Sequence, residues 1–120
     1  MPAWEVEVTD QWVVWFESLT EAEQDDVAAV VGLVEARGPQ LPYPYSSGIA
    51  ASAHPHMREL RIQSGGQPLR TLYAFDPCRT AILLVGGTKT GDNRWYDRVV
   101  PNADRLYTEH LNALRKEKLI

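Results

Sequence analysis

The sequence predicts an α+β fold in which a twisted, mainly antiparallel sheet carries a helical hairpin on one face and ends in a C-terminal helix. Three observations predict the element order β-α-α-β-β-β-α. Residues 57–85 contain three strand-like stretches separated by turns that contain Gly and Pro. Residues 9–37 place apolar side chains at helical spacing, and residues 101–114 do so again.

Size and composition fit one globular domain over residues 1–120. The chain is 44% hydrophobic and 23% charged, and no apolar run reaches the length of a membrane span. The first ten residues carry acids and no basic segment, so we expect no signal peptide and a cytoplasmic location. A lone Cys78 excludes an internal disulfide and a cysteine-based zinc site.

The charge is divided unevenly along the chain. The whole protein has a net charge of −4, yet residues 1–37 hold nine acids and one base, whereas residues 38–120 hold seven acids and eleven bases. Such asymmetry indicates a surface that faces a polyanion, although helix surfaces that simply collect acids explain it equally well.

The first strand and helix come at the N-terminus. Residues 4–8 alternate apolar and acidic side chains, the period of a half-buried strand. Thr9 or Asp10 can cap a short helix that runs to about Leu19. We expect its aromatic stripe to pack in the core.

A second helix follows directly. Residues 20–23 (Thr-Glu-Ala-Glu) fit a capping box, in which the Thr and Glu side chains each satisfy a free backbone N–H. Gly38 and Pro39 should end this helix, which would form an antiparallel hairpin with the first.

Residues 39–56 hold four prolines and no acid or base, which predicts a loop or an irregular crossover. His54 and His56 flank Pro55 near its end. Without a nearby carboxylate cluster, two such histidines are expected to be solvated, so no metal and no cofactor is predicted.

The strands of the meander come next. Strand period two places Arg58 and Arg61 on opposite faces of the strand that begins at Met57. Residues 64–68 form a hairpin loop, and residues 69–75 form the next strand.

The remaining elements complete the order. Residues 76–79 match a type I turn, and residues 80–85 form a continuous apolar strand expected at the centre of the sheet. Gly86-Gly87 should then end the strand and give the backbone conformational freedom. Residues 88–97 are polar and basic and show neither a helical nor a strand periodicity. Pro101 is expected to begin the last helix.

Arginines within strands suggest an anion site. A buried guanidinium is costly unless it meets a carboxylate or a phosphate, and Arg58, Arg61 and Arg70 all lie in strands. Pleat geometry allows only one of Arg58 and Arg61 to share the site of Arg70, and Arg61 is favoured because Arg58 shares its face with Leu60 and Ile62.

The stretch from residue 57 to residue 96, with the elements around it, resembles the RelE superfamily, and within it the phage-derived HigB-like toxins of type II toxin–antitoxin systems. The resemblance is carried by Arg-Glu-Leu-Arg at residues 58–61, a Gly turn, Leu-Arg-Thr-Leu-Tyr-Ala-Phe at residues 69–75, the apolar strand, and the Lys/Thr segment that leads into a helix. It covers nearly the whole chain, and no single motif in it is as specific as a P-loop.

The resemblance implies a RelE-like fold and a ribosome-dependent mRNA endoribonuclease that inhibits translation. It implies metal-free attack of a 2′-OH on the adjacent phosphate, mRNA in the ribosomal A site as the substrate, and silencing by a cognate antitoxin, which is expected to be of the helix-turn-helix type. Arg70 stands where the family carries an arginine that faces the scissile phosphate. The residues implied in catalysis are Arg70, Lys89, Arg94 and Tyr96. Those implied in RNA binding are Arg61, Arg58, Trp95 and Arg98.

Alternatives remain open at this point. Arg70 can instead pair with Asp76 or Asp97, and the segment from Lys89 to Tyr96 can be an exposed loop with incidental charge. Some relatives carry a C-terminal histidine as acid or base, whereas His110 here is expected to lie in the core. The alternative function is therefore a catalytically weak or inactive RelE-like protein that acts as an antitoxin-binding module.

Overall fold

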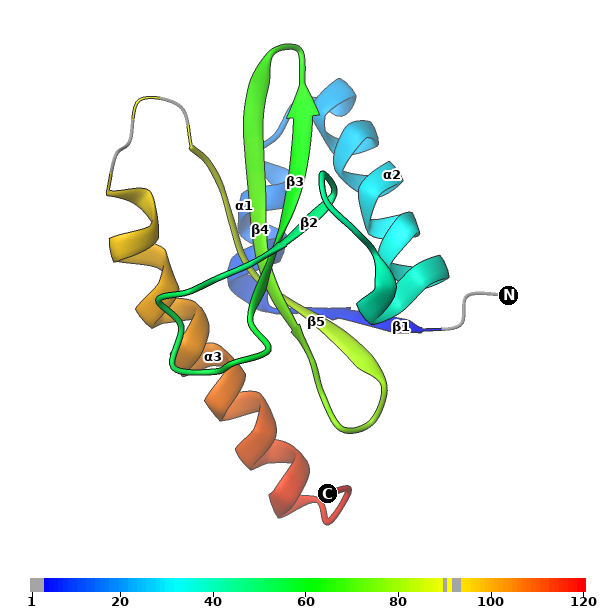
Figure 1. Cartoon of the computed structure of the whole chain (residues 1–120), viewed down its shortest axis with the longest axis vertical. Helices are drawn as coiled ribbons and strands as arrows, with labels where there is room; N and C mark the ends of the chain where they lie inside the picture. The colour runs from blue at the N-terminus through cyan, green and yellow to red at the C-terminus, as the bar shows by residue number, and fades with distance from the viewer. Residues whose placement is uncertain (1–3, 90, 92–93) are drawn as a thin grey trace.

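The computed structural model describes residues 4–89, 91 and 94–120. Its elements, in chain order, are β1 (Glu5–Val8), α1 (Asp10–Glu17), α2 (Glu21–Arg37), the short 3-10 helix η1 (Gly38–Gln40), β2 (Ser46–Gly48), β3 (Arg58–Ser64), β4 (Gln67–Phe75), β5 (Thr80–Thr88) and α3 (Trp95–Lys116). The five strands form one sheet in the order β1-β5-β4-β3-β2 (Figure 1). β1 runs parallel to β5, and the other neighbouring pairs are antiparallel. The predicted fold class is confirmed.

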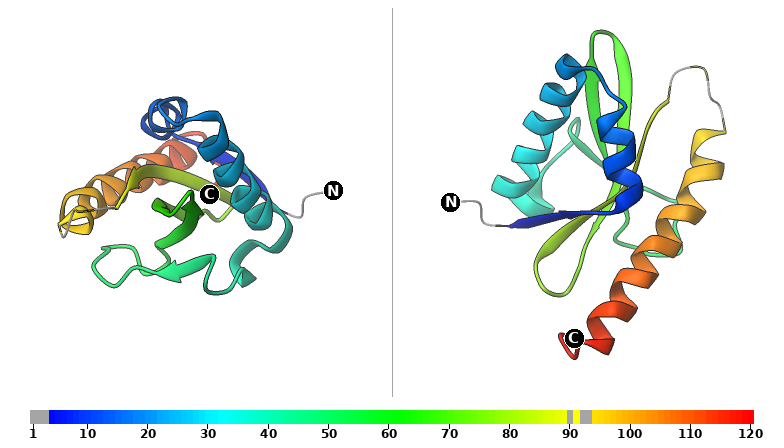
Figure 2. Two further views of the ribbon diagram at one scale, coloured as in Figure 1. Left: turned by 90° about the horizontal axis from the view of Figure 1, so that it is seen from above. Right: turned by 180° about the vertical axis from the view of Figure 1, so that it is seen from behind.

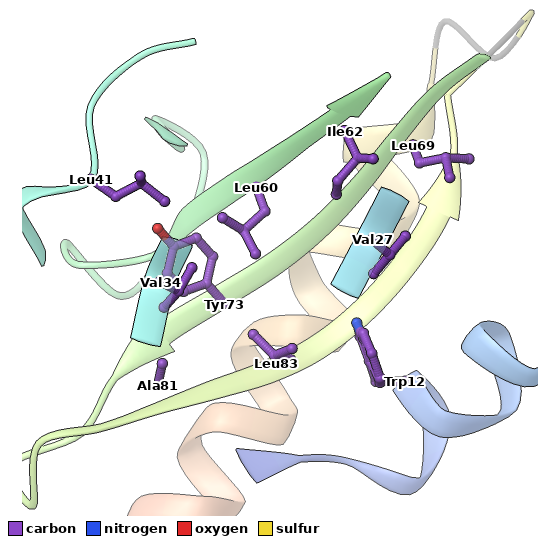
Figure 3. Close-up of a cluster of buried hydrophobic side chains, with 10 residues drawn as sticks. All are labelled: Trp12, Val27, Val34, Leu41, Leu60, Ile62, Leu69, Tyr73, Ala81 and Leu83. Carbon is purple, nitrogen blue, oxygen red and sulfur yellow. The ribbon is translucent and has the colours of Figure 1, made fainter. Parts of the chain in front are cut away.

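The sheet separates two apolar cores. Helices α1 and α2 contribute to one of them, which is shown in Figure 3, and α3 contributes to the other (Figures 1 and 2). In the first core the Trp12 indole N–H donates a hydrogen bond to the Thr71 hydroxyl over 3.1 Å, so a large apolar side chain is buried with its polar atom satisfied. In the second, the Tyr107 hydroxyl donates to the Phe75 carbonyl over 2.6 Å. None of the helices within the described ranges is both long and apolar enough to cross a membrane.

The two N-terminal helices begin at the predicted caps. Thr9 accepts a hydrogen bond from the Trp12 N–H, which starts α1. The Thr20 hydroxyl accepts from the Glu23 N–H, and the Glu23 carboxylate accepts from the Thr20 N–H, so the predicted capping box is confirmed. Each cap stabilises its helix by about 1 kcal/mol.

Gly86 and Gly87 lie within β5 rather than after it, which corrects the expectation that they free the backbone. A Cβ on Gly86 would collide with the Trp15 indole, and one on Gly87 would collide with the Trp95 indole. Successive residues of a strand face opposite sides of the sheet. The two glycines therefore admit one tryptophan against each face.

The start of the last helix was predicted wrongly. α3 begins at Trp95, and Pro101 lies inside it rather than at its first turn. Proline removes one backbone hydrogen bond there. Burial of Trp95 and Val100 in the second core offsets this cost.

The predicted irregular segment 39–56 also contains structure that its sequence does not signal. Two of the three residues of η1 and the whole strand β2 lie in it, and β2 pairs with the start of β3. A strand of Ser-Ser-Gly has no hydrophobic alternation, so it could not be read as one.

Candidate functional site

Three charged side chains meet on the face of the sheet that carries α3. Arg61 and Arg70 are direct cross-strand partners in β3 and β4. Glu59 precedes Arg61 by two residues, so it shares this face. Its Oε1 lies 3.0 Å from Arg61 Nη1 and 3.7 Å from Arg70 Nε. Glu59 and Arg70 are only 3% and 6% exposed, which makes this a buried cluster of two cations around one anion.

Tyr96, in the first turn of α3, completes the cluster. Its hydroxyl donates a hydrogen bond to Glu59 Oε2 over 2.6 Å. Burial, followed by the hydrogen bond to Glu59 and the negative charge of Glu59, raises the pKa of Tyr96 to about 12, although the nearby Arg70 opposes the shift. The Lys89 ammonium lies 4.8 Å from the centre of the Tyr96 ring. Tyr96 is therefore a protonated hydrogen-bond donor at neutral pH.

One N–H group of the Arg70 guanidinium has no hydrogen-bond acceptor among the described residues. Its Nη1 donates to the Leu69 carbonyl over 2.9 Å, but its buried Nε has no hydrogen-bond partner in the described part of the chain, because 3.7 Å to Glu59 is too long. Leaving such a group unpaired costs about 1–3 kcal/mol. Two neighbouring guanidinium groups that line a cavity and share one carboxylate are suited to receive an oxyanion.

Two cavities adjoin the cluster. One, of about 410 Å³, has Arg61 and Arg70 in its wall, together with residues of α2 and of the loop before β2. The other, of about 350 Å³, has Glu59 and Tyr96 in its wall, together with residues 47–51. Both ends of the cluster therefore border space that a ligand can enter.

The predicted RNA-binding residues do not all gather here. Arg58 points to the opposite face, where its Nε donates to the Ser46 hydroxyl over 2.8 Å. Trp95 is 4% exposed and packs against Gly87, so it is a core residue and its ring is not free to stack on a base. Arg94 and Arg98 are exposed at the start of α3.

The acid beside Arg70 is Glu59, not the predicted alternatives Asp76 or Asp97. Asp76 lies in the β4–β5 turn and accepts a hydrogen bond from His110 Nε2 at 2.7 Å. His110 is thus partly buried in a structural pair away from the arginines. Within the described ranges, no group of three or more His, Cys, Asp or Glu side chains could hold a metal ion.

Glu59 is the member of the site that the sequence analysis missed. Strand parity puts Glu59 on the face of Arg61, but parity does not show that its carboxylate reaches Arg70 on the next strand. The usable signal was a carboxylate on the arginine-bearing face of a strand, where burial demands a cationic partner.

Comparisons with known proteins agree with this fold. The family model "Phage derived protein Gp49-like (DUF891)" matches residues 14–108. Two Mycobacterium tuberculosis proteins with toxin names are similar in sequence. HigB2 is 37% identical over 106 residues, covering 87% of this chain, and HigB3 is 41% identical over 102 residues, covering 80% of it. The chain spans 53% of the length of HigB2 and 88% of that of HigB3.

A solved structure is similar in fold. The archaeal RelE–RelB complex from Pyrococcus horikoshii contains a chain that matches with a TM-score of 0.55 and 14% identity. The match covers 73% of this chain and 97% of that one. At this identity the likeness concerns the fold alone.

Proposed function

The chain belongs to the Gp49-like family of phage-derived proteins, and from this premise we propose that it is a HigB-like toxin of the RelE superfamily and part of a type II toxin–antitoxin module. We propose further that it is a ribosome-dependent endoribonuclease that cuts mRNA in the A site, and thus acts in the cytoplasm. The toxin names of its relatives support the first statement. The second rests on the site.

One observation carries the proposed activity. Arg61 and Arg70 stand side by side at the wall of a cavity, and Arg70 is buried there. One carboxylate, Glu59, faces two guanidinium groups, so the cluster keeps one unmatched positive charge. A phosphodiester carries the charge and the acceptor oxygens that this arrangement lacks.

The side chains suit metal-free transesterification. Glu59 takes the proton of the 2′-OH, whose oxygen forms a bond to the adjacent phosphorus while the bond from phosphorus to O5′ breaks. Arg61 and Arg70 stabilise the charge on the phosphoryl oxygens. Tyr96 gives its proton to O5′, leaving a cyclic phosphate and a 5′-OH. Because Tyr96 is hydrogen-bonded to Glu59, the proton held by Glu59 can return to Tyr96 and restore both groups.

The other predicted basic residues fit supporting roles. Lys89 lies against the Tyr96 ring, where its charge favours the phenolate that forms as Tyr96 gives up its proton. Arg94 and Arg98 are exposed at the same end of α3 and would contact the RNA backbone. The partner that silences the protein would be a cognate antitoxin, in line with the RelE–RelB complex that shares the fold.

A second candidate function is a non-catalytic module that binds an antitoxin. It is favoured by the existing ion pair between Glu59 and Arg61, which a substrate phosphate must displace or share. In that case the cluster would serve only to hold β3 and β4 together.

Inducible expression in bacteria separates the two. We expect growth arrest and mRNA cleavage at ribosomes with the wild type, and loss of both with Glu59→Gln or Arg70→Met, provided that circular dichroism shows folded protein. Glu109→Gln, which alters an exposed ion pair with Arg105, is the matched control and should remain toxic. Folded wild-type protein that leaves growth and mRNA intact would support the non-catalytic module.

A further inference from the structure

Two tyrosines stand exposed next to the arginine cluster. Tyr43 is 69% exposed and Tyr45 is 43% exposed, on the segment that leads from η1 into β2. In Figure 1 this segment passes between the end of α2 and β2, beside β3. Large aromatic rings that remain in solvent on a folded surface commonly mark a binding site.

The backbone holds these rings in place. The Tyr45 and Ser46 N–H groups both donate to the Pro42 carbonyl at 3.1 Å, and the Tyr45 carbonyl accepts from the Arg61 N–H at 2.9 Å. The Ser46 side chain is anchored to the buried Tyr73 hydroxyl at 2.6 Å. The rings are therefore presented by a segment fixed to the edge of β3, and binding would cost little ordering of the chain.

Arg61 joins these tyrosines to the cluster. Its guanidinium carbon lies 5.2 Å from the centre of the Tyr43 ring, while its Nη1 contacts Glu59. Tyr45 lines the same 410 Å³ cavity as Arg61 and Arg70. The cavity contains one acid, Asp26, whose carboxylate accepts a hydrogen bond from the Ser64 hydroxyl at 2.5 Å.

We propose that Tyr43 and Tyr45 form a stacking platform for the base of the nucleotide next to the phosphate held by Arg61 and Arg70. This inference rests on the proposed function and extends its substrate site across the edge of β3. A ring face binds any unpaired base by stacking, and single-stranded RNA is the ligand that brings a base and a phosphate one nucleotide apart. Arg61 lies against the Tyr43 ring and beside Arg70, so the base and the phosphate would both lie next to it.

Binding to an RNA that cannot be cut tests the platform separately from catalysis. The probe is a fluorescein-labelled 2′-O-methyl RNA of about ten nucleotides, long enough for one such site, and its blocked 2′ oxygen cannot attack the phosphate. Affinity is measured by fluorescence anisotropy at low salt for the wild type, Tyr43→Ala, Tyr45→Ala and the two matching Phe variants. Val14→Ala, at a 70% exposed apolar side chain on α1, is the control.

We expect each alanine variant to bind roughly 10-fold more weakly, and the Phe variants and Val14→Ala to bind as the wild type does. An abasic probe of the same length should remove the difference between the wild type and the alanine variants. Absence of wild-type binding, unchanged affinity in both alanine variants, or an equal loss with the abasic probe would each overturn the platform. Unchanged affinity is also the outcome if these rings serve a protein partner.

Failure of the proposed activity has a different signature. If the platform binds bases as described but natural mRNA is never cut on ribosomes, the nuclease proposal fails and the platform stands. If mRNA is cut and the tyrosines do not affect binding, the nuclease proposal stands and the platform fails.

Discussion

Replacing Glu59 with glutamine should destabilise the protein strongly, because it leaves Arg70 charged and buried without its carboxylate. Glu59→Gln keeps the size of the side chain and an oxygen that can accept the Tyr96 hydrogen bond, so the main change is the loss of one negative charge. Arg61, whose side chain is 28% exposed, can turn toward water. Arg70, whose side chain is 7% exposed, cannot.

The size of the effect follows from this burial. Removing one partner of a buried ion pair typically costs about 3–5 kcal/mol. Because the Arg61 side chain can turn into solvent, we expect a loss of stability near the lower end, at about 3 kcal/mol. For a chain of this length such a loss lowers the melting temperature by about 12 °C. It lowers the urea midpoint by about 1.5 M for a slope near 2 kcal/mol/M.

A double-mutant cycle in urea isolates the pair. The cycle combines Glu59→Gln with Arg70→Met, which fills much of the same space without a charge. We expect the double variant to be about 2 kcal/mol more stable than the sum of the two single losses predicts. Glu109→Gln is the control, because Glu109 and Arg105 pair with side chains that are 59% and 54% exposed, and it should cost less than about 1 kcal/mol.

Two results would contradict this pairing: a Glu59→Gln loss of stability no larger than that of Glu109→Gln, or losses at Glu59 and Arg70 that simply add. Either result would mean that the two charges do not depend on each other, and the account of Glu59 as the buried counter-ion would have to be abandoned.

Two further predictions concern a titration and the backbone. The pKa of Tyr96, raised to about 12 first by burial and then by Glu59, should fall in Glu59→Gln but stay above 10, because the burial remains. A raised tyrosine pKa stabilises the fold below pH 10, and this contribution is lost as the pH rises toward 12, so the wild type should lose stability over this window more steeply than Tyr96→Phe. Ultraviolet difference spectra measure the pKa, and urea melts measure the stability. Equal slopes in the two proteins would contradict a raised pKa at Tyr96. Gly87→Ala should destabilise by about 1–3 kcal/mol because its Cβ meets the Trp95 indole, whereas Gly32→Ala, with open space in α2, should stabilise by about 0.5–1 kcal/mol. Calorimetry of the pair should give opposite signs, and like signs would refute the packing argument.

The fold could be predicted largely because its signals are local. The capping box at Thr20 and Glu23 follows from adjacent residues, and strand parity follows from the period of two. The start of α3 could not be predicted this way. Pro101 carries a strong local preference for a first helical turn. Packing of Trp95 against Gly87, a contact between β5 and α3, outweighs it.

The site shows the same division between local and distant information. Parity predicted that Arg61 and Arg70 could share a face, and the register of β3 and β4 puts them opposite each other. The acids that the sequence offers as partners of Arg70, Asp76 and Asp97, both follow its strand in the chain. Glu59 belongs to the neighbouring strand, and only the register brings its carboxylate to Arg70.

The overall acidity of the chain and its arginine cluster are compatible because they act over different distances. At physiological salt, exposed charges are screened beyond about 8 Å, so acids farther than that from the arginines have little effect on a phosphate held there, whereas Asp26 of α2 lines the same cavity as Arg61 and Arg70. In the proposed function, Arg61 and Arg70, together with Arg94 and Arg98 at the start of α3, contact only a few phosphates, and the affinity that so few charge contacts supply is limited. Recognition by such a protein must therefore draw on contacts that do not depend on charge. The exposed rings of Tyr43 and Tyr45 beside Arg61 supply a contact of that kind.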